Sequence, residues 1–240
     1  MWANAPQYAG GGWLGYDATG ILFAATGDAG RSGDPTGSAQ DDTSRLGKIV
    51  RIVPNPDPYA GASAVFFIVS QVAKGLPQPN GGSPFNNGVL LADHGQDVAE
   101  ELDFLAPGAT VSNFGWPFKE GTRTVNGTPP AGLIDPLLEY FRSGGLRTGQ
   151  AIIGGGRGPS AIASLANQYV FGDGSGAIFS VPVASLVVGS TVQADSIERR
   201  DADFAPDQGT IAHPVAITPG PNGTLYILDS DGDLFRVDAG

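Results

Sequence analysis

The sequence contains no cysteine and has few positive charges, and both deficits restrict what the protein can do. Without cysteine the chain has no disulfides, no thiolate zinc site and no cysteine nucleophile. It carries 13 lysine and arginine residues against 24 aspartate and glutamate residues, so its formal net charge is −11. This charge opposes binding to nucleic acid and to anionic lipid, whereas it suits a hard cation such as calcium, which takes carboxylate oxygens.

Long apolar runs are also missing. No stretch approaches the roughly 20 apolar residues that a membrane helix needs. Met1–Pro6 offer neither a basic nor an apolar signal region, so we expect no membrane insertion and no signal peptide in this chain. Hydrophobic residues make up 41% of the chain, which is enough for a single large domain over residues 1–240.

Short apolar runs rich in β-branched and aromatic residues recur along the chain, and each is bounded by Gly, Pro, Asn or Asp. This pattern is typical of strands, and no long stretch holds the 3.6-residue period of a helix. The predicted strands are Ile21–Ala25, Lys48–Val53, Ala64–Val72, Gly88–Ala92, Glu101–Leu105, Ala151–Ile153, Gln168–Phe171, Ala177–Val183, Thr224–Leu228 and Asp233–Val237.

Turn residues between these runs predict hairpins. Asp17–Gly20, Pro221–Gly223 and Asp231–Gly232 supply the Gly and Asn residues that tight turns require. The segments 15–23 and 218–226 share a turn, a glycine, a leucine and an aromatic residue, which indicates a repeat. We therefore predict an all-β propeller of four-stranded antiparallel blades, with about four or five blades in this chain.

Several glycine- and acid-rich segments follow one another in a definite order, namely Gly27–Gly30, Gly33–Pro35, Ala39–Asp41, Leu46–Ile52, Gly95–Asp103, Asn113–Pro117, Asp135–Tyr140, Ile152–Gly155 and Tyr169–Asp173. Together they resemble the glucose/sorbosone dehydrogenases, soluble quinoproteins that use pyrroloquinoline quinone (PQQ) and calcium on a six-bladed propeller. The resemblance covers nearly all of the chain, although members of that family are longer. It implies a soluble periplasmic or secreted protein, and it implies that the ring is closed or its sheet edges shielded, for instance in a homo-oligomer.

The resemblance implies a histidine base that removes a proton from a sugar hydroxyl, and an aspartate that orients this histidine. Asp28 matches the aspartate, but Ala9 stands where the histidine is expected. A positioned base contributes about 10² to 10⁴ in rate, which Asp28 alone does not replace. Of the two histidines in the chain, His94 either lines the central channel or caps a strand end, and His213 is interpreted as a packing or turn residue.

The cofactor loop implied by the resemblance corresponds to Gly75–Pro79, where Pro77 replaces an arginine. Gln78 can hydrogen-bond to a quinone but brings no positive charge. The backbone carbonyls of Gly75 and Pro79 are the calcium ligands that this loop implies. Arg157 is the remaining candidate cation for a bound anion or quinone.

A second candidate calcium site lies near the C-terminus. Asp229, Asp231 and Asp233 alternate around Gly232, which resembles the first half of a calcium loop, although the later bidentate glutamate is absent. The same residues also suit an ordinary hairpin turn.

Three functions remain open at this point, each with a small-molecule sugar or lactone as ligand or substrate. The first is a PQQ-dependent aldose dehydrogenase-like protein with a degenerate site, whose activity is altered or lost. The second is a calcium-dependent propeller hydrolase that acts on lactones or esters with His94 as the base. The third is a non-catalytic binding module. Fold alone does not choose among them, because function resides in the site.

Overall fold

The computed structural model describes residues 11–30, 32–61, 64–108, 110–144 and 147–238 of the chain. Its regular elements are strands and four single-turn 3-10 helices, η1 (Val183–Ser185), η2 (Ala194–Ser196), η3 (Asp201–Asp203) and η4 (Pro221–Gly223). The predicted all-β class is therefore confirmed.

The strands form four successive sheets, which we call the first to fourth blades and which are antiparallel except where β8 pairs with β4 in parallel. The first blade has the order β1 (Gly12–Tyr16), β2 (Leu22–Thr26), β3 (Lys48–Pro54), β4 (Phe67–Lys74) and β8 (Ser112–Asn113). The second runs from β5 (Pro79–Phe85) through β6 (Gly88–Asp93) and β7 (Ala99–Leu105) to β11 (Leu138–Phe141). The third runs from β12 (Ile152–Arg157) through β13 (Gln168–Asp173) and β14 (Ile178–Pro182) to β15 (Glu198–Arg199). The fourth has β16 (Pro214–Pro219), β17 (Leu225–Asp229) and β18 (Leu234–Val237), while β9 (Lys119–Glu120) and β10 (Arg123–Thr124) form a separate small hairpin.

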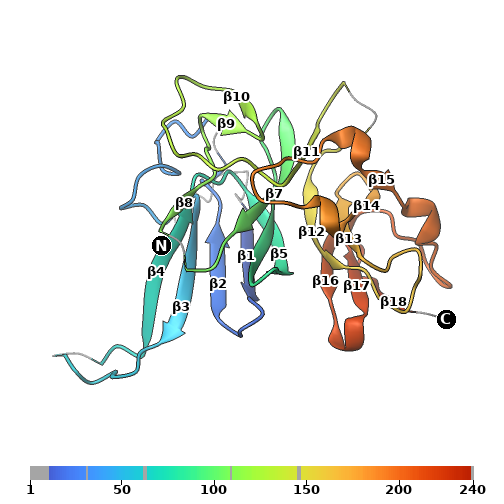
Figure 1. The fold of residues 1–240 in the computed structure, drawn as a ribbon, viewed down its shortest axis with the longest axis horizontal. Coiled ribbons are helices and arrows are strands. Elements are labelled where there is room, and N and C mark those ends of the chain that lie inside the picture. Colours follow the sequence, from blue (N-terminus) through green and yellow to red (C-terminus); the bar gives the residue numbers. More distant parts are fainter. Residues whose placement is uncertain (1–10, 31, 62–63, 109, 145–146, 239–240) are drawn as a thin grey trace.

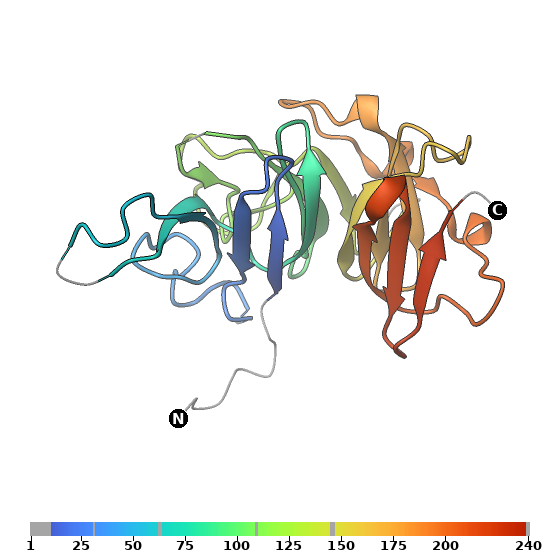
Figure 2. The ribbon, with the colours of Figure 1, turned by 90° about the horizontal axis from the view of Figure 1, so that it is seen from below.

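The blades follow one another in chain order along an arc (Figures 1 and 2). The first strand of each blade contacts the first strand of the next blade, and we call these the inner strands. β1 packs against β5, β5 against β12, and β12 against β16. This radial arrangement of meandering sheets is that of a propeller.

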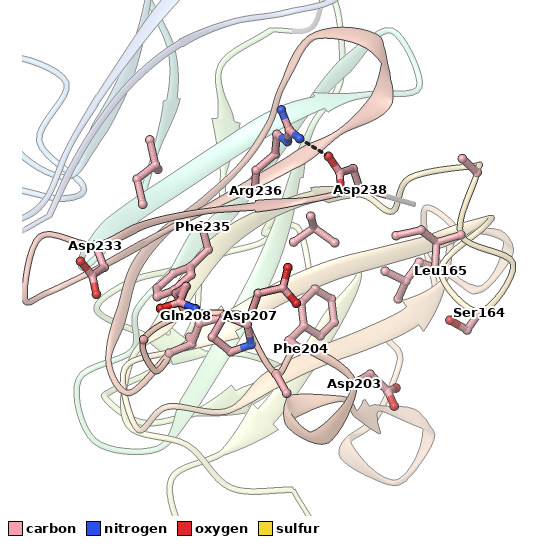
Figure 3. Close-up of a pocket in the computed structure, with 18 residues that line it drawn as sticks. Ser164, Leu165, Asp203, Phe204, Asp207, Gln208, Asp233, Phe235, Arg236 and Asp238 are labelled. Carbon is pink, nitrogen blue, oxygen red and sulfur yellow. Dashed lines mark ion pairs between the residues drawn. The ribbon is translucent and has the colours of Figure 1, made fainter. Parts of the chain in front are cut away.

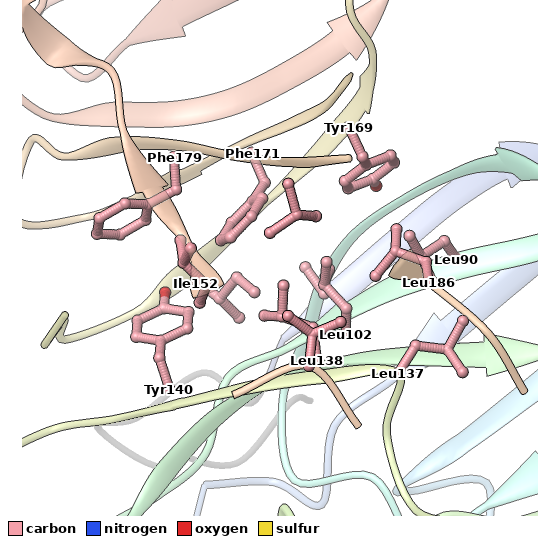
Figure 4. Packing of buried hydrophobic residues seen from close by; sticks show 14 of the residues in the cluster. Leu90, Leu102, Leu137, Leu138, Tyr140, Ile152, Tyr169, Phe171, Phe179 and Leu186 are labelled. Atoms are coloured by element: carbon pink, nitrogen blue, oxygen red, sulfur yellow. The ribbon is translucent and has the colours of Figure 1, made fainter. Parts of the chain in front are cut away.

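Each pair of neighbouring blades encloses an apolar cluster. The largest cluster lies between the second and third blades and includes Leu102 and Tyr140 from one side and Phe171 and Phe179 from the other (Figure 4). The Tyr140 and Phe179 rings lie 5.5 Å apart between centroids, which is within the range of favourable aromatic contacts. Two further clusters lie between the first and second blades and between the third and fourth.

All ten predicted strands correspond to observed ones, and the turns 17–20, 221–223 and 231–232 connect hairpins as predicted. The prediction missed the inner strands β1, β5 and β16, as well as several short outer strands. The estimate of about four blades agrees with the four sheets. On β1, the exposed fractions of Leu14 and Tyr16 are 67% and 58%, so one face of the first blade is open. Closure of the ring or oligomerisation stays a prediction.

The inner strands of the second and third blades meet through glycine. A Cβ on Gly154 would lie 2.8 Å from the Gly81 Cα, and a Cβ on Gly81 would lie 2.6 Å from the Gly154 Cα. Both distances are shorter than a side chain tolerates, so the backbones of β5 and β12 can approach this closely only without side chains.

Gly154→Ala is therefore expected to lower the free energy of unfolding by about 1–3 kcal/mol, because the added methyl group forces β12 away from β5. Urea unfolding followed by tryptophan fluorescence measures the change. Gly12→Ala is the matched control, since its Cβ would meet nothing within 4 Å. Equal stability of the two variants would contradict the close approach.

Candidate functional site

A cavity of about 430 Å³ opens where β2, β6 and β11 end and β5 begins. We call it the His94 pocket. Its volume is in the range of small-molecule sites. The lining residues are Asp28, Gly30, Ser32, Pro77, Gln78, His94, Gly95, Gln96, Asp97 and Arg142.

The Pro77–Gln78 backbone brings three of the sequence-predicted residues together. The Asp28 N–H donates to the Pro77 carbonyl at 3.0 Å, and the His94 N–H donates to the Gln78 carbonyl at 3.0 Å. The Gln78 N–H in turn donates to Asp93 Oδ1 at 2.8 Å. Asp28, Gln78 and His94 therefore line one pocket, although they come from distant parts of the chain.

Asp28 is a buried carboxyl group with two fixed donors. Trp116 Nε1–H donates to Asp28 Oδ2 at 2.8 Å, and the Gly30 N–H donates to Oδ1 at 2.8 Å. Burial raises the pKa of Asp28, although both hydrogen bonds oppose this increase. A carboxylate can accept about four hydrogen bonds, so Asp28 retains acceptor capacity toward the pocket.

His94 is held neutral by its surroundings. Burial and the neighbouring Arg142 guanidinium lower the pKa of His94 to about 4. Arg142 Nη2 contacts His94 Nε2. A guanidinium only donates, so Nε2 must accept, and the imidazole proton is assigned to Nδ1. Neither ring nitrogen is then a free acceptor for a substrate proton.

Arg142 is committed to groups of the protein itself. Its Nε donates to Glu100 Oε1 at 2.9 Å, and its Nη1 donates to the Gln96 carbonyl at 2.6 Å. Its Nη2 also contacts the Gln150 carbonyl. Burial raises the pKa of Glu100 to about 7, against the opposing effect of Arg142 and of the Ile152 N–H that Glu100 accepts.

Three further carboxyl groups converge beside the pocket, on the face of β6 and β7 that meets the first blade. Ligand oxygens of Asp93, Glu101 and Asp103 lie within 4.8 Å of one another, and all three residues are buried. Burial raises the pKa of each well above its usual value. Asp93 Oδ2 and both Asp103 oxygens have no hydrogen-bond partner. Orphaned buried oxygens of this kind are the donors that a hard cation takes, so we call this group the carboxylate triad.

The other sequence-predicted cofactor and metal residues do not join the His94 pocket. Arg157 lies at the far end of β12, where its Nη2 donates to Asn86 Oδ1 at 3.1 Å. The Gly75 carbonyl accepts the Trp116 N–H, and Pro79 pairs with Asp93 at the start of β5. Ala9 lies outside the described residues.

The C-terminal aspartates form a hairpin. Asp229 Oδ2 accepts the N–H groups of Ala212 and His213, and Asp231 Oδ1 accepts the Asp233 N–H at 3.1 Å. Among the described residues the carboxylate triad is the one group of three that meets the geometric condition for a metal, so these aspartates do not converge on a common point. His213 is exposed, as expected of a turn residue, and is not among the pocket residues.

Sequence reasoning missed Arg142 and the carboxylate triad. Arg142 follows the outer strand β11, and nothing in the local pattern of Tyr140–Arg142 points to the pocket. The triad did leave a signal, because Glu101 and Asp103 alternate at the strand period within an apolar run. Two carboxyl groups on one face of a buried strand require an explanation. The third member of the triad, Asp93, lies on the neighbouring strand β6 and pairs there with Glu101.

Comparison with known proteins agrees with the sequence resemblance. A family model described as Glucose / Sorbosone dehydrogenase matches residues 2–171. No helix among the described residues is long and apolar enough to cross a membrane.

Solved structures show the same fold. A PQQ-bound aldose sugar dehydrogenase from Streptomyces coelicolor is 19% identical with a TM-score of 0.62, over 95% of this chain and 61% of its own. An aldose sugar dehydrogenase from Escherichia coli in the apo form is 21% identical with a TM-score of 0.61, over 94% and 62%. A calcium structure of a Trichoderma reesei Carbohydrate-Active Enzymes Family AA12 protein is 16% identical with a TM-score of 0.65, over 94% and 67%. The chain thus spans about 61–62% of the length of the two dehydrogenases.

Arg142→Met is expected to destabilise the protein by about 3 kcal/mol, because it leaves the Glu100 carboxylate buried without its cation. Urea unfolding at pH 8 gives the free energy. Adding Glu100→Gln to Arg142→Met should restore most of the loss, since the amide carries no charge. Additive effects of the two substitutions would show that the pair is not coupled.

Proposed function

The chain belongs to the glucose/sorbosone dehydrogenase family, and from this premise we propose that it binds a sugar in the His94 pocket but has lost the quinone-dependent oxidation. The fold and the family are shared with sugar dehydrogenases. The sugar ligand and the loss of oxidation are inferred from the residues of this chain.

One observation carries the proposal: the histidine of the pocket contacts Arg142 through Nε2, and its pKa is lowered to about 4. Oxidation of a sugar hydroxyl requires a base within hydrogen-bond reach of that hydroxyl, and the family resemblance implies a histidine in this role with the aspartate only orienting it. The chain has two histidines, and His213 is not among the pocket residues. The acceptor nitrogen of His94 is taken by Arg142, and its lowered pKa makes it a weak base.

The charges of the pocket also do not suit PQQ, which is a tricarboxylate quinone. Asp28 and Asp97 bring negative charge to the lining, and Arg142 is its one cation among the described residues. The Arg142 donors are occupied by Glu100, His94 and backbone carbonyls. The residues present therefore do not fit this cofactor, and no step of the proposed function depends on it.

A neutral polyhydroxyl ligand suits the same lining. Asp28 can accept hydrogen bonds from sugar hydroxyls, as its two fixed donors leave lone pairs free. The Gln78 side-chain amide has no partner among the described residues and can both donate and accept. A sugar carries no charge, so the negative lining does not repel it.

The hydrolase alternative receives no support from this geometry. Lactone hydrolysis would need His94 as a base, and the Arg142 contact opposes that role just as it opposes dehydrogenation. A non-catalytic binding module is the alternative that the same observation favours, and it differs from the proposal only in the chemical class of the ligand. The family resemblance further favours a periplasmic or extracellular location.

Calcium, which the family implies, fits the carboxylate triad. Asp93, Glu101 and Asp103 would hold the ion with carboxylate oxygens, and the cation would take the place of the protons that their raised pKa values retain. Bound there, calcium would neutralise the buried charge and link β6 to β7. Its contribution in this chain is structural.

Aldoses are expected to bind wild-type protein with millimolar affinity, and Gln78→Ala and Asp28→Asn should each weaken binding about 10-fold by removing a charge-assisted or amide hydrogen bond. Isothermal titration with glucose, galactose and xylose measures the affinities. Arg157→Met is the control, because Arg157 lies away from the pocket.

With PQQ and calcium added, reduction of a redox dye by aldoses should stay at background. PQQ-dependent dye reduction, or the absence of any sugar binding, would contradict the proposal.

Calcium is expected to raise the melting temperature by about 5 °C or more at 100-fold excess over its dissociation constant, since it binds the folded state alone. The shift between calcium and chelator should disappear in Asp103→Asn, while the exposed Asp57→Asn control keeps it. Calorimetry of the folded protein with calcium gives an independent value. An unchanged melting temperature with no heat of binding would remove calcium from the carboxylate triad.

A further inference from the structure

Two large cavities lie away from the His94 pocket, and they differ in whether the arginine that lines them is paired. A groove of about 840 Å³ lies beside the fourth blade. Arg236 is the one cation among its described lining residues, and it is paired with Asp238, as Figure 3 shows. The other cavity has a volume of about 670 Å³ and lies between the first and second blades. We call it the Arg51 pocket, because its arginine has no such partner.

The Arg51 pocket and the His94 pocket lie at opposite ends of the same strands. The Arg51 pocket opens where β2 and β6 begin and β7 ends, whereas the His94 pocket opens where β2 and β6 end. The strands β2, β3 and β6, which contribute to its walls, are each paired on both sides. The cavity is therefore enclosed by two adjacent sheets, and its volume is in the range of small-molecule sites.

The floor of the Arg51 pocket is apolar. Phe23, Val89 and Leu105 line it, and all three belong to the buried cluster between the first and second blades. Ile21 and Val72 also line the pocket and pack against that cluster. An apolar group that enters the pocket would therefore be removed from water against aliphatic and aromatic side chains, which is favourable.

Arg51 brings an uncompensated positive charge to this apolar surface. It lies in the middle of β3, directly opposite Phe23 on β2, and paired residues of neighbouring strands share one face of the sheet. Its Nε is buried and has no hydrogen-bond partner in the structure. None of the ion pairs among the described residues includes Arg51. Buried polar groups nearly always have a partner, so this orphaned donor indicates that an acceptor belongs in the pocket.

The other polar groups of the pocket leave this charge unbalanced. Asp17 is the one acid among the described lining residues. Its Oδ1 accepts the Thr19 N–H at 2.8 Å, the Thr19 hydroxyl at 2.7 Å and the Ile21 N–H at 3.0 Å, so it stabilises its own turn. Ser70 lies opposite Arg51 on β4, and its hydroxyl has no hydrogen-bond partner within the described residues. A ligand in the pocket thus meets a guanidinium and a hydroxyl that are both available.

We propose that the Arg51 pocket is a second ligand site, which binds a small monocarboxylate with an apolar body. Arg51 donates from Nε and a terminal nitrogen to the two carboxylate oxygens, the bidentate pairing that a guanidinium favours. The Ser70 hydroxyl donates to one of the same oxygens, and the apolar body packs on Phe23 and Leu105. One guanidinium with Asp17 nearby compensates a single negative charge, so a carboxylate suits the pocket better than a phosphate dianion.

The first test compares three probes of similar shape on the whole chain, by isothermal titration at pH 8. Phenylacetate is expected to bind with a dissociation constant of roughly millimolar or tighter, in keeping with its few atoms. Phenylacetamide keeps the shape but has no charge, so it should bind about 10-fold more weakly. Phenyl phosphate, a dianion at this pH, should also bind more weakly, because its second charge has no cation in the pocket.

The second test assigns the binding to Arg51. Arg51→Met keeps the apolar stem of the side chain and removes the guanidinium, so phenylacetate should bind about 10-fold more weakly or worse. Ser70→Ala should weaken binding about 3-fold through the loss of one hydrogen bond. Arg236→Met is the matched control, because it removes the same charge from the chain at the other cavity and should leave phenylacetate binding unchanged. The melting temperature of each variant shows that it is folded.

Three results would overturn the proposal: phenylacetamide that binds as tightly as phenylacetate, phenyl phosphate that binds more tightly, or Arg51→Met with unchanged affinity for phenylacetate. If Arg51→Met does not fold, the comparison of the three probes on the wild-type chain and the Ser70→Ala variant give the answer.

A competition experiment separates this site from the His94 pocket. Saturating glucose should leave the affinity for phenylacetate unchanged, because the two pockets share no residue. Displacement of phenylacetate by glucose would place both ligands in one pocket and refute a second site. Failure of glucose to bind at all would contradict the proposed function and leave the Arg51 pocket unaffected.

Discussion

The close approach of the inner strands is the constraint on which the rest of the structure depends. Gly81 on β5 and Gly154 on β12 meet backbone to backbone, which sets the separation of the second and third blades. At that separation the Ile152 N–H of the third blade reaches Glu100 Oε2 of the second at 2.9 Å. The same spacing places the Gln150 carbonyl against Arg142. The pocket wall is therefore a consequence of two facing glycines, because any side chain there would separate its components.

Strands that depend on apolar side chains could be predicted from the sequence, and strands that depend on backbone proximity could not. The ten predicted strands follow runs of β-branched and aromatic residues, whose burial stabilises them wherever they lie. The inner strand β5 reads Pro-Asn-Gly-Gly-Ser-Pro-Phe, a composition that favours a turn. At Gly81 it packs so closely against Gly154 of the third blade that a side chain is excluded there. That requirement arises from the neighbouring blades and is not visible in the local sequence.

The candidate site likewise contains residues that could be predicted from the sequence and a residue that could not. Asp28, Gln78 and His94 were predictable because they belong to motifs shared with a family, and the backbone of residues 77–78 does bring them together. Arg142 was not predictable, since it reaches the pocket only through the register of β11 against β7, where Phe141 faces Ala99. Yet Arg142 determines what His94 can do, because it takes the acceptor nitrogen of the imidazole. The chemistry of a residue identified by motif is thus decided by one that no motif identifies.

The distribution of buried charge supports the proposal that the pocket binds a neutral ligand without oxidising it. Asp93, Glu100, Glu101 and Asp103 are all buried, so the core of the second blade has a large excess of acid. Each buried carboxyl must be protonated, paired or bound to a cation, since an isolated charge there costs several kcal/mol. Arg142 compensates Glu100 and in doing so loses its capacity to bind an anionic ligand. Hydroxyl groups need no compensating charge, and they remain able to bind where Asp28 and Gln78 face the pocket. The proposed preference for a neutral ligand is therefore linked to the stability of the blade itself.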